Sequence, residues 1–216
     1  MSDLFARLTP TKIPIQSIGD GAMLLRGFCA EEAAALVRAI ERIAAQAPFR
    51  SMTVPGGGTM SVAMTNCGSV GWVTDRTGYR YTAEDPLSGK TWPAMPDIFR
   101  ALAARAAEAA GYAAFTPDAC LINRYAAGAR MGLHQDKDER NFTQPIVSVS
   151  LGLPATFLWG GHKRADKTQR FTLENGDVVV WGGPTRRVFH GVAPLKSRTD
   201  PLTGSVRYNL TFRRAL

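Results

Sequence analysis

The second half of the chain contains many short strand-like segments that follow one another without helices between them. Apolar runs and alternating runs separated by turn residues predict strands at residues 119–125, 146–151, 155–159, 170–173, 177–181, 187–190 and 206–213. A parallel sheet built from βαβ units needs a helix after nearly every strand. The pattern therefore favours a β-sandwich or jelly roll.

The first half of the chain predicts two helices on either side of a glycine-rich segment. Residues 1–21 are predicted to form an arm, and Met23–Phe28 a short strand. Apolar residues at helical spacing predict helices over Glu31–Gln46 and Pro96–Ala110. Trp72, Tyr79 and Tyr81 lie in the weakly apolar segment between the helices, where an exposed binding surface is one interpretation. An ordinary hairpin with its aromatic rings folded onto the core is the other.

His134 and Asp136 are two residues apart in a segment predicted to be extended, so their side chains point to the same side. His190 is the candidate third ligand for a metal at this pair. Two histidines and one carboxylate leave coordination positions open, an arrangement expected of non-heme Fe(II) oxygenases. On its own, a histidine beside an aspartate more often forms a surface ion pair or an ordinary hydrogen bond. His162, in a glycine-rich basic turn, is predicted to be exposed and not a ligand.

The C-terminal segment alternates strictly between apolar and polar residues. Tyr208, Leu210 and Phe212 share one face of the predicted strand, and Arg207, Asn209, Thr211 and Arg213 share the other. Two guanidinium groups on one face can bind carboxylates through paired charge-assisted hydrogen bonds. Periodicity alone also allows an edge strand with its polar face in water. Next to an open Fe(II) site, the arginine face indicates a 2-oxo dicarboxylate, 2-oxoglutarate.

These motifs together resemble the AlkB family of Fe(II)/2-oxoglutarate-dependent dioxygenases. The resemblance lies in Asn123-Arg124-Tyr125, His134 to Asp138, His190 and Arg207 to Arg213, and it extends to residues 60–68, 92–96 and 176–183. It implies a mostly β fold with N-terminal helices, in which a double-stranded β-helix (jelly roll) core carries a nucleotide-recognition lid. The expected single domain, 1–216, comprises an N-terminal arm, strand and helix (1–53), the lid (54–86), the second helix (87–118) and the core with its Fe/2-oxoglutarate site (119–216).

The resemblance also implies a role for each motif residue. His134, Asp136 and His190 are the expected catalytic iron ligands. The expected contacts of 2-oxoglutarate are Asn123, Arg124, Tyr125, Arg207, Asn209, Thr211 and Arg213, with Arg207 at the distal carboxylate and Arg213 near the metal. The expected substrate contacts are Trp72, Tyr79, Arg80, Tyr81, Asp138 and Arg164. Trp72 is expected to stack on the extruded base opposite His134, and Asp138 to face a cationic ring.

The implied reaction is an oxidative demethylation that uses Fe(II), 2-oxoglutarate and O2 to repair alkylation damage. It hydroxylates the N-methyl group of 1-methyladenine or 3-methylcytosine and releases formaldehyde. The expected partner is alkylated DNA, single- or double-stranded, and RNA is left open as a further substrate. The net charge of +8, with pI near 9.8, also favours a polyanionic partner.

The cysteines and the distribution of apolar residues also bear on the cellular compartment. The three cysteines are scattered and lack Cys-x-x-Cys spacing, which favours a reducing cytoplasm. The first residues do not resemble a signal peptide, and no apolar run approaches membrane length. A cytoplasmic monomer without membrane association is expected.

Two other functions remain as alternatives. One is an Fe(II)/2-oxoglutarate hydroxylase acting on a protein or a small molecule, against which the basic charge and the aromatic segment argue. The other is a non-catalytic lesion-binding module with a structural zinc ion. A structural zinc site needs four protein ligands, and only three positions in the sequence suit the metal.

Overall fold

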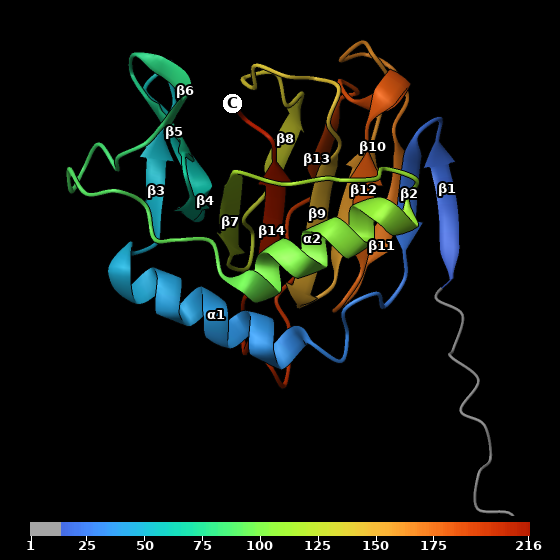
Figure 1. The fold of residues 1–216 in the computed structure, drawn as a ribbon, viewed down its shortest axis with the longest axis horizontal. Helices are drawn as coiled ribbons and strands as arrows, with labels where there is room; N and C mark the ends of the chain where they lie inside the picture. The colour runs from blue at the N-terminus through green and yellow to red at the C-terminus, as the bar shows by residue number, and fades with distance from the viewer. Residues whose placement is uncertain (1–13) are drawn as a thin grey trace, which may run out of the picture.

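In the computed structural model, which describes residues 14–216, the strands form two antiparallel sheets that pack face to face (Figure 1). The large sheet contains, in spatial order, β1 (Ile15–Gly19), β2 (Ala22–Leu25), β12 (Val178–Trp181), β9 (Ile146–Gly152), β14 (Arg207–Arg213), β7 (Ala119–Tyr125), β4 (Thr59–Gly68) and β3 (Arg50–Thr53). The small sheet contains β11 (Gln169–Leu173), β10 (Ala155–Trp159), β13 (His190–Val192) and β8 (Met131–His134). This arrangement confirms the predicted mostly β fold of the jelly-roll type.

Two helices cover the outer face of the large sheet, α1 (Ala33–Gln46) and α2 (Asp97–Ala109), as Figure 1 shows. Leu36 and Ile40 of α1 recur at helical spacing and are buried in one core with the helix-facing side of the large sheet. In α2, Leu102 is buried as expected, but Ile98 is only partly covered, and Phe99 is fully buried instead. Neither helix of the described chain has the length and apolar character needed to cross a membrane.

The space between the two sheets receives the alternate side chains of the central strands. On β14, Leu210 and Phe212 point toward the helices, whereas Arg207 and Arg213 point toward the small sheet. Asn123 of the neighbouring β7 also faces the small sheet. Because successive side chains of a strand point to opposite faces, the predicted polar face of the C-terminal strand lies inside the molecule.

The segment predicted as a lid consists of two different parts. β4 belongs to the large sheet, where it pairs with β7 and β3. β5 (Gly71–Asp75) and β6 (Gly78–Thr82) form a separate hairpin next to β3 and β4, at one edge of the molecule (Figure 1). We refer to residues 71–82 as the β5–β6 hairpin.

The ends of several elements differ from the sequence predictions. β1 lies within the predicted arm, whose first 13 residues are outside the described part of the chain. β1 is mostly exposed and is held by pairing with β2, so it has no amphipathic pattern to reveal it. The strand predicted at residues 187–190 begins instead at His190, because a 3-10 turn, η1 (Gly183–Thr185), and the turn after it occupy the preceding residues.

Candidate metal centre and adjoining cavities

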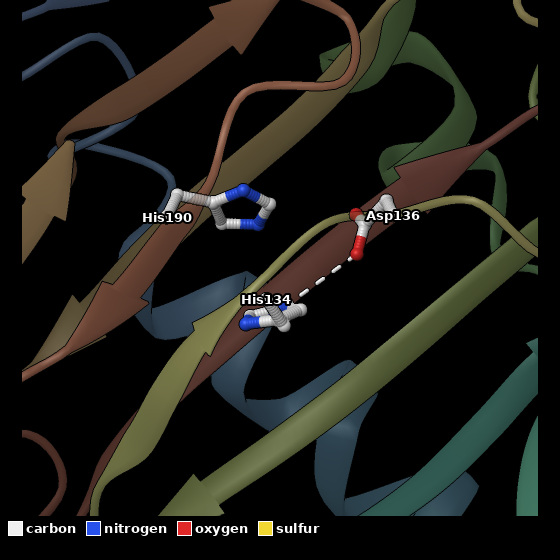
Figure 2. A group of neighbouring side chains, drawn as sticks. All are labelled: His134, Asp136 and His190. Carbon is white, nitrogen blue, oxygen red and sulfur yellow. Dashed lines mark ion pairs between the residues drawn. The ribbon is translucent and has the colours of Figure 1, made fainter. Parts of the chain in front are cut away.

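Three side chains that could bind a metal meet between the two sheets: His134, Asp136 and His190 (Figure 2). One ligand atom from each lies within 4.8 Å of the others. His134 ends β8 and His190 begins β13, and the two residues are paired across these strands with ring centroids 4.4 Å apart. Asp136 follows β8 and places Oδ1 3.6 Å from Nε2 of His134. The structure therefore brings together the three residues predicted as ligands.

Backbone carbonyl groups orient both imidazole rings. Nδ1 of His134 lies 2.9 Å from the carbonyl oxygen of Gly132, and Nδ1 of His190 lies 3.1 Å from that of Val188. A carbonyl oxygen only accepts hydrogen bonds, so each Nδ1 must carry the hydrogen. The Nε2 lone pair of each neutral ring is then available to a metal, as is usual for histidine ligands whose other nitrogen is held by a carbonyl group.

The protonation states at this site suit metal binding. Burial raises the pKa of Asp136, but the charges of Arg213 and, to a lesser degree, of the two histidines outweigh it and hold the pKa well below its ordinary value. Burial, together with repulsion from His134, lowers the pKa of His190 to about 3. At neutral pH Asp136 is therefore ionised and His190 is neutral, the forms that coordinate metals.

A narrow cavity of about 50 Å³ adjoins the metal residues and contains buried donors without partners. Arg207 is 1% exposed; its Nη2 donates to Oγ of Ser150 at 2.9 Å, and its guanidinium lies over the ring of Tyr125. Nε and Nη1 of Arg207 and Nη1 of Arg213 have no partner among the described residues. Buried guanidinium donors without acceptors are costly. Their presence on one cavity fits a small ligand with carboxylate groups, such as 2-oxoglutarate.

Polar side chains of three neighbouring strands complete the wall of this cavity. Nδ2 of Asn209 donates to Oγ of Ser148 at 2.9 Å and to the backbone of β9, and its Oδ1 accepts from Asn123 and Thr211. Both amide hydrogens of Asn209 are thus used within the sheet, whereas Oδ1 of Asn123 lacks a partner in the described chain. The sequence reasoning missed Ser148 and Ser150, although they alternate with valines in residues 146–151 and could have been found by the same periodicity.

Arg124 does not face this cavity, which corrects its expected role as a contact of 2-oxoglutarate. It lies between Asn123 and Tyr125 on β7, so its side chain leaves the opposite face of the sheet. There it is exposed, and its guanidinium lies 4.7 Å from the ring centroid of Phe49.

A second cavity, of about 400 Å³, opens beside His134 and is lined by predicted substrate contacts. Nε1 of Trp72 donates to Oδ2 of Asp138 at 2.8 Å, and the Trp72 ring stacks on Tyr79 with centroids 5.7 Å apart. Arg164 lies on another side of the opening, where it donates to the carbonyl oxygen of Leu133. Trp72, Tyr79, Asp138 and Arg164 thus share one opening next to the metal residues.

Two of the expected substrate contacts on the β5–β6 hairpin, Arg80 and Tyr81, do not line the second cavity. The hydroxyl of Tyr81 donates to Oε1 of Glu139 at 2.7 Å; Glu139 lines the second cavity, whereas Tyr81 does not. Arg80 is partly exposed, pairs with Asp75 and lines neither cavity. His162 is exposed, as predicted, and lies outside the cluster of ligand atoms.

Comparison with known proteins agrees with this geometry. The model of the 2OG-Fe(II) oxygenase superfamily matches residues 21–213. The chain is 58% identical to the alpha-ketoglutarate-dependent dioxygenase AlkB of Escherichia coli (strain K12) over 215 residues, covering 100% of this chain and 98% of that protein. It is 29% identical to the tRNA demethylase abh1 of Schizosaccharomyces pombe over 138 residues, 62% of this chain and 46% of that protein. The solved structure of OsALKBH1 is similar with a TM-score of 0.82 and 31% identity, covering 93% of this chain and 100% of that one. The chain belongs to the AlkB family of the 2OG-Fe(II) oxygenase superfamily.

Proposed function

We propose that this chain is an Fe(II)- and 2-oxoglutarate-dependent dioxygenase that removes N-methyl groups from 1-methyladenine and 3-methylcytosine in DNA. The observation that carries the proposal is the pair of buried arginines, Arg207 and Arg213, which line the same cavity as His134 and His190 and have donors without a partner among the described residues. The overall reaction converts 2-oxoglutarate to succinate and carbon dioxide, hydroxylates the methyl carbon and releases formaldehyde.

Fe(II) would be held by His134, Asp136 and His190, because one ligand atom from each lies within 4.8 Å of the others and backbone carbonyl groups bind Nδ1 of both histidines, leaving Nε2 for the metal. Together with 2-oxoglutarate and O2, the iron supplies the oxidising chemistry that amino-acid side chains lack. The chain supplies orientation: the carbonyl groups at Gly132 and Val188 hold the two rings in place. It also excludes water, since Asp136 and His190 are buried.

Arg207 would bind the distal carboxylate of 2-oxoglutarate, because its two free nitrogens lie deep between the sheets beside Tyr125. Arg213 would bind near the carboxylate at the metal, since its guanidinium also touches Asp136. Asn123 lies at the same wall, and its Oδ1 has no partner within residues 14–216. Thr211 and Asn209 support the wall through their mutual hydrogen bond.

The damaged base would enter the second cavity and stack on Trp72. Extruding a base costs a few kcal/mol, and least for an unpaired or damaged one, so single-stranded substrate is expected to react faster than duplex. Methylation at these ring nitrogens makes the base cationic. The Asp138 carboxylate at the cavity wall suits such a base, and its hydrogen bond to Trp72 holds the stacking ring in position.

The nucleic-acid backbone would lie over the basic turn that contains Lys163, Arg164 and Lys167. These three side chains are exposed, and Arg164 borders the second cavity. Phosphate contacts release counterions, so oligonucleotide affinity should fall as salt rises. Action on RNA, a monomeric state and a cytoplasmic location are part of the same proposal; the three buried free thiols suit a reducing compartment.

The two other functions are less well supported. A hydroxylase of proteins or small molecules would leave the stacked pair Trp72–Tyr79 beside Asp138 without a purpose. A structural zinc site would need a fourth protein ligand, and the metal cluster found among residues 14–216 has three.

The test is a product assay with single-stranded oligonucleotides that contain 1-methyladenine or 3-methylcytosine. Succinate and formaldehyde should form together under Fe(II) and 2-oxoglutarate, and His134→Ala should abolish both. His162→Ala is the matched control, because this histidine is exposed and outside the metal cluster. Succinate formation without demethylation of any oligonucleotide would assign the substrate to another class.

A further inference from the structure

A buried group of charged side chains, formed by Glu139, Arg186 and Arg213, contacts Asp136. Its centre is Glu139, which is 6% exposed. Oε1 of Glu139 accepts a hydrogen bond from the Tyr81 hydroxyl at 2.7 Å and lies 3.3 Å from Nε of Arg213. Oε2 lies 3.2 Å from Nη2 of Arg186. Glu139 therefore joins three segments that are distant in the sequence.

Arg186 of this group also binds two backbone carbonyl groups. Its side chain is 3% exposed, and it comes from the turn that follows η1. Nη1 donates to the carbonyl oxygen of Asp136 at 3.0 Å, and Nε donates to that of Gln144 at 3.0 Å. Arg186 thus holds the loop after β8 at two points, one of them the backbone of a metal residue.

Arg213 connects the group to the metal centre. Its Nε and Nη2 bind Oδ2 of Asp136, and the same Nε faces Glu139. The charges balance, with two carboxylates against two guanidinium groups. Buried ion pairs add little stability compared with apolar residues of the same size, and their best-attested use is to specify one geometry. In this protein the ion pairs fix the position of the Asp136 carboxylate and that of the Arg213 guanidinium beside the cavity.

Tyr81 extends the group into the β5–β6 hairpin. It is the cross-strand partner of Trp72, which lines the second cavity. The hydroxyl of Tyr81 holds the hairpin to Glu139, and the hairpin carries Trp72. The placement of the aromatic ring and that of the metal carboxylate therefore depend on the same glutamate.

We propose that Glu139 is a positioning residue, whose carboxylate holds the Arg213 guanidinium against Asp136 and, through the Tyr81 hydroxyl, joins the β5–β6 hairpin to the metal site. The inference rests on the proposed function, since it concerns the same site. Coupling between two sites is reciprocal, so under this proposal loosening the hairpin weakens binding at the metal cavity, and occupying the cavity steadies the hairpin.

The experiment compares Glu139→Gln and Tyr81→Phe with two matched controls. Asp177→Asn removes another buried carboxylate that pairs with an arginine, and Tyr112→Phe removes another hydroxyl bound inside the fold, to the Gly21 carbonyl. Both controls lie outside the group around Glu139. Amide hydrogen exchange of residues 71–82 is measured on the metal-free protein, and 2-oxoglutarate affinity is measured by anaerobic titration of the Fe(II) protein.

Both test variants should exchange faster in the hairpin and bind 2-oxoglutarate about 10-fold more weakly, within the usual range of coupling between sites. The double variant should be no weaker than Glu139→Gln, since residues in one network act non-additively. The controls should leave hairpin exchange and affinity unchanged. If Glu139→Gln does not fold, Tyr81→Phe, which loses a single oxygen atom, still tests whether Tyr81 connects the hairpin to the metal site.

Unchanged affinity in Tyr81→Phe and Glu139→Gln, or equal losses in the controls, would overturn the inference. If the wild-type protein bound neither Fe(II) nor 2-oxoglutarate, the proposed function would fail instead. Hairpin exchange in the metal-free protein would still report on the Tyr81–Glu139 link, so the two failures are distinguishable.

Discussion

Arg213 donates two hydrogen bonds to the same carboxylate oxygen of Asp136, Oδ2, from Nε at 3.0 Å and from Nη2 at 2.8 Å. The other oxygen of Asp136, Oδ1, faces Nε2 of His134. The guanidinium thus occupies one oxygen and leaves the other toward the metal position. Both side chains are buried, so the pair is shielded from solvent.

Removing this guanidinium should destabilise the fold strongly. Arg213→Gln leaves the carboxylates of Asp136 and Glu139 buried without their shared cation, and breaking a buried pair costs about 3–5 kcal/mol. Urea unfolding of the metal-free protein measures this loss. Arg214→Gln is the control, because its exposed side chain lies 3.6 Å from Asp118, and such a pair contributes less than about 1 kcal/mol. Equal effects of the two substitutions would contradict this account.

Substitutions on the two faces of the β7–β14 pair should differ in their effect on KM for 2-oxoglutarate. Arg207→Lys keeps the charge in the cavity but loses the paired donors, so KM for 2-oxoglutarate should rise at least about 10-fold. Arg124→Lys should leave that KM unchanged, because Arg124 lies on the other face over Phe49. Succinate formation at varied 2-oxoglutarate measures both. A rise in KM for Arg124→Lys would instead assign Arg124 to 2-oxoglutarate binding.

Asp138 should contribute to the recognition of a cationic base. In Asp138→Asn the negative charge at the second cavity is lost, and kcat/KM for a 1-methyladenine oligonucleotide should fall about 10-fold, the usual value of one charge-assisted hydrogen bond. KM for 2-oxoglutarate should stay the same. Formaldehyde release measures the effect, with Asp97→Asn as the control, because Asp97 is exposed and forms a surface ion pair with Arg100. Full activity of Asp138→Asn would rule out an electrostatic role.

Acid should destabilise the metal-free protein through His190. Its pKa in the folded protein is about 3, below the usual value of about 6.5, so the unfolded chain binds more protons between these two values. Stability must therefore fall as pH is lowered through this window. Urea midpoints at pH 7 and pH 5 should differ less in His190→Gln than in the wild type, whereas His162→Gln should keep the full difference. Parallel pH profiles in all three proteins would contradict this prediction.

Alternation along single strands is determined by the sequence by itself. The polar face of Arg207 to Arg213 and the shared direction of His134 and Asp136 follow from the period of two in an extended chain. The same local regularity predicted α1 and α2 and the succession of short strands. Membership of the AlkB family, indicated by these motifs, is confirmed by the comparisons.

Contacts between distant segments were decided by the tertiary structure alone. In Asn123-Arg124-Tyr125, adjacency in a motif suggested a common role, yet packing of the large sheet turns Arg124 outward and its neighbours inward. Tyr81 likewise reads as a surface aromatic residue, but its hydroxyl binds the buried Glu139. Local patterns report which side chains share a face. Which face is buried depends on how the sheets and loops pack. The same packing decides which distant charged group pairs with a buried one, because an ionised group can be buried only where it meets a partner.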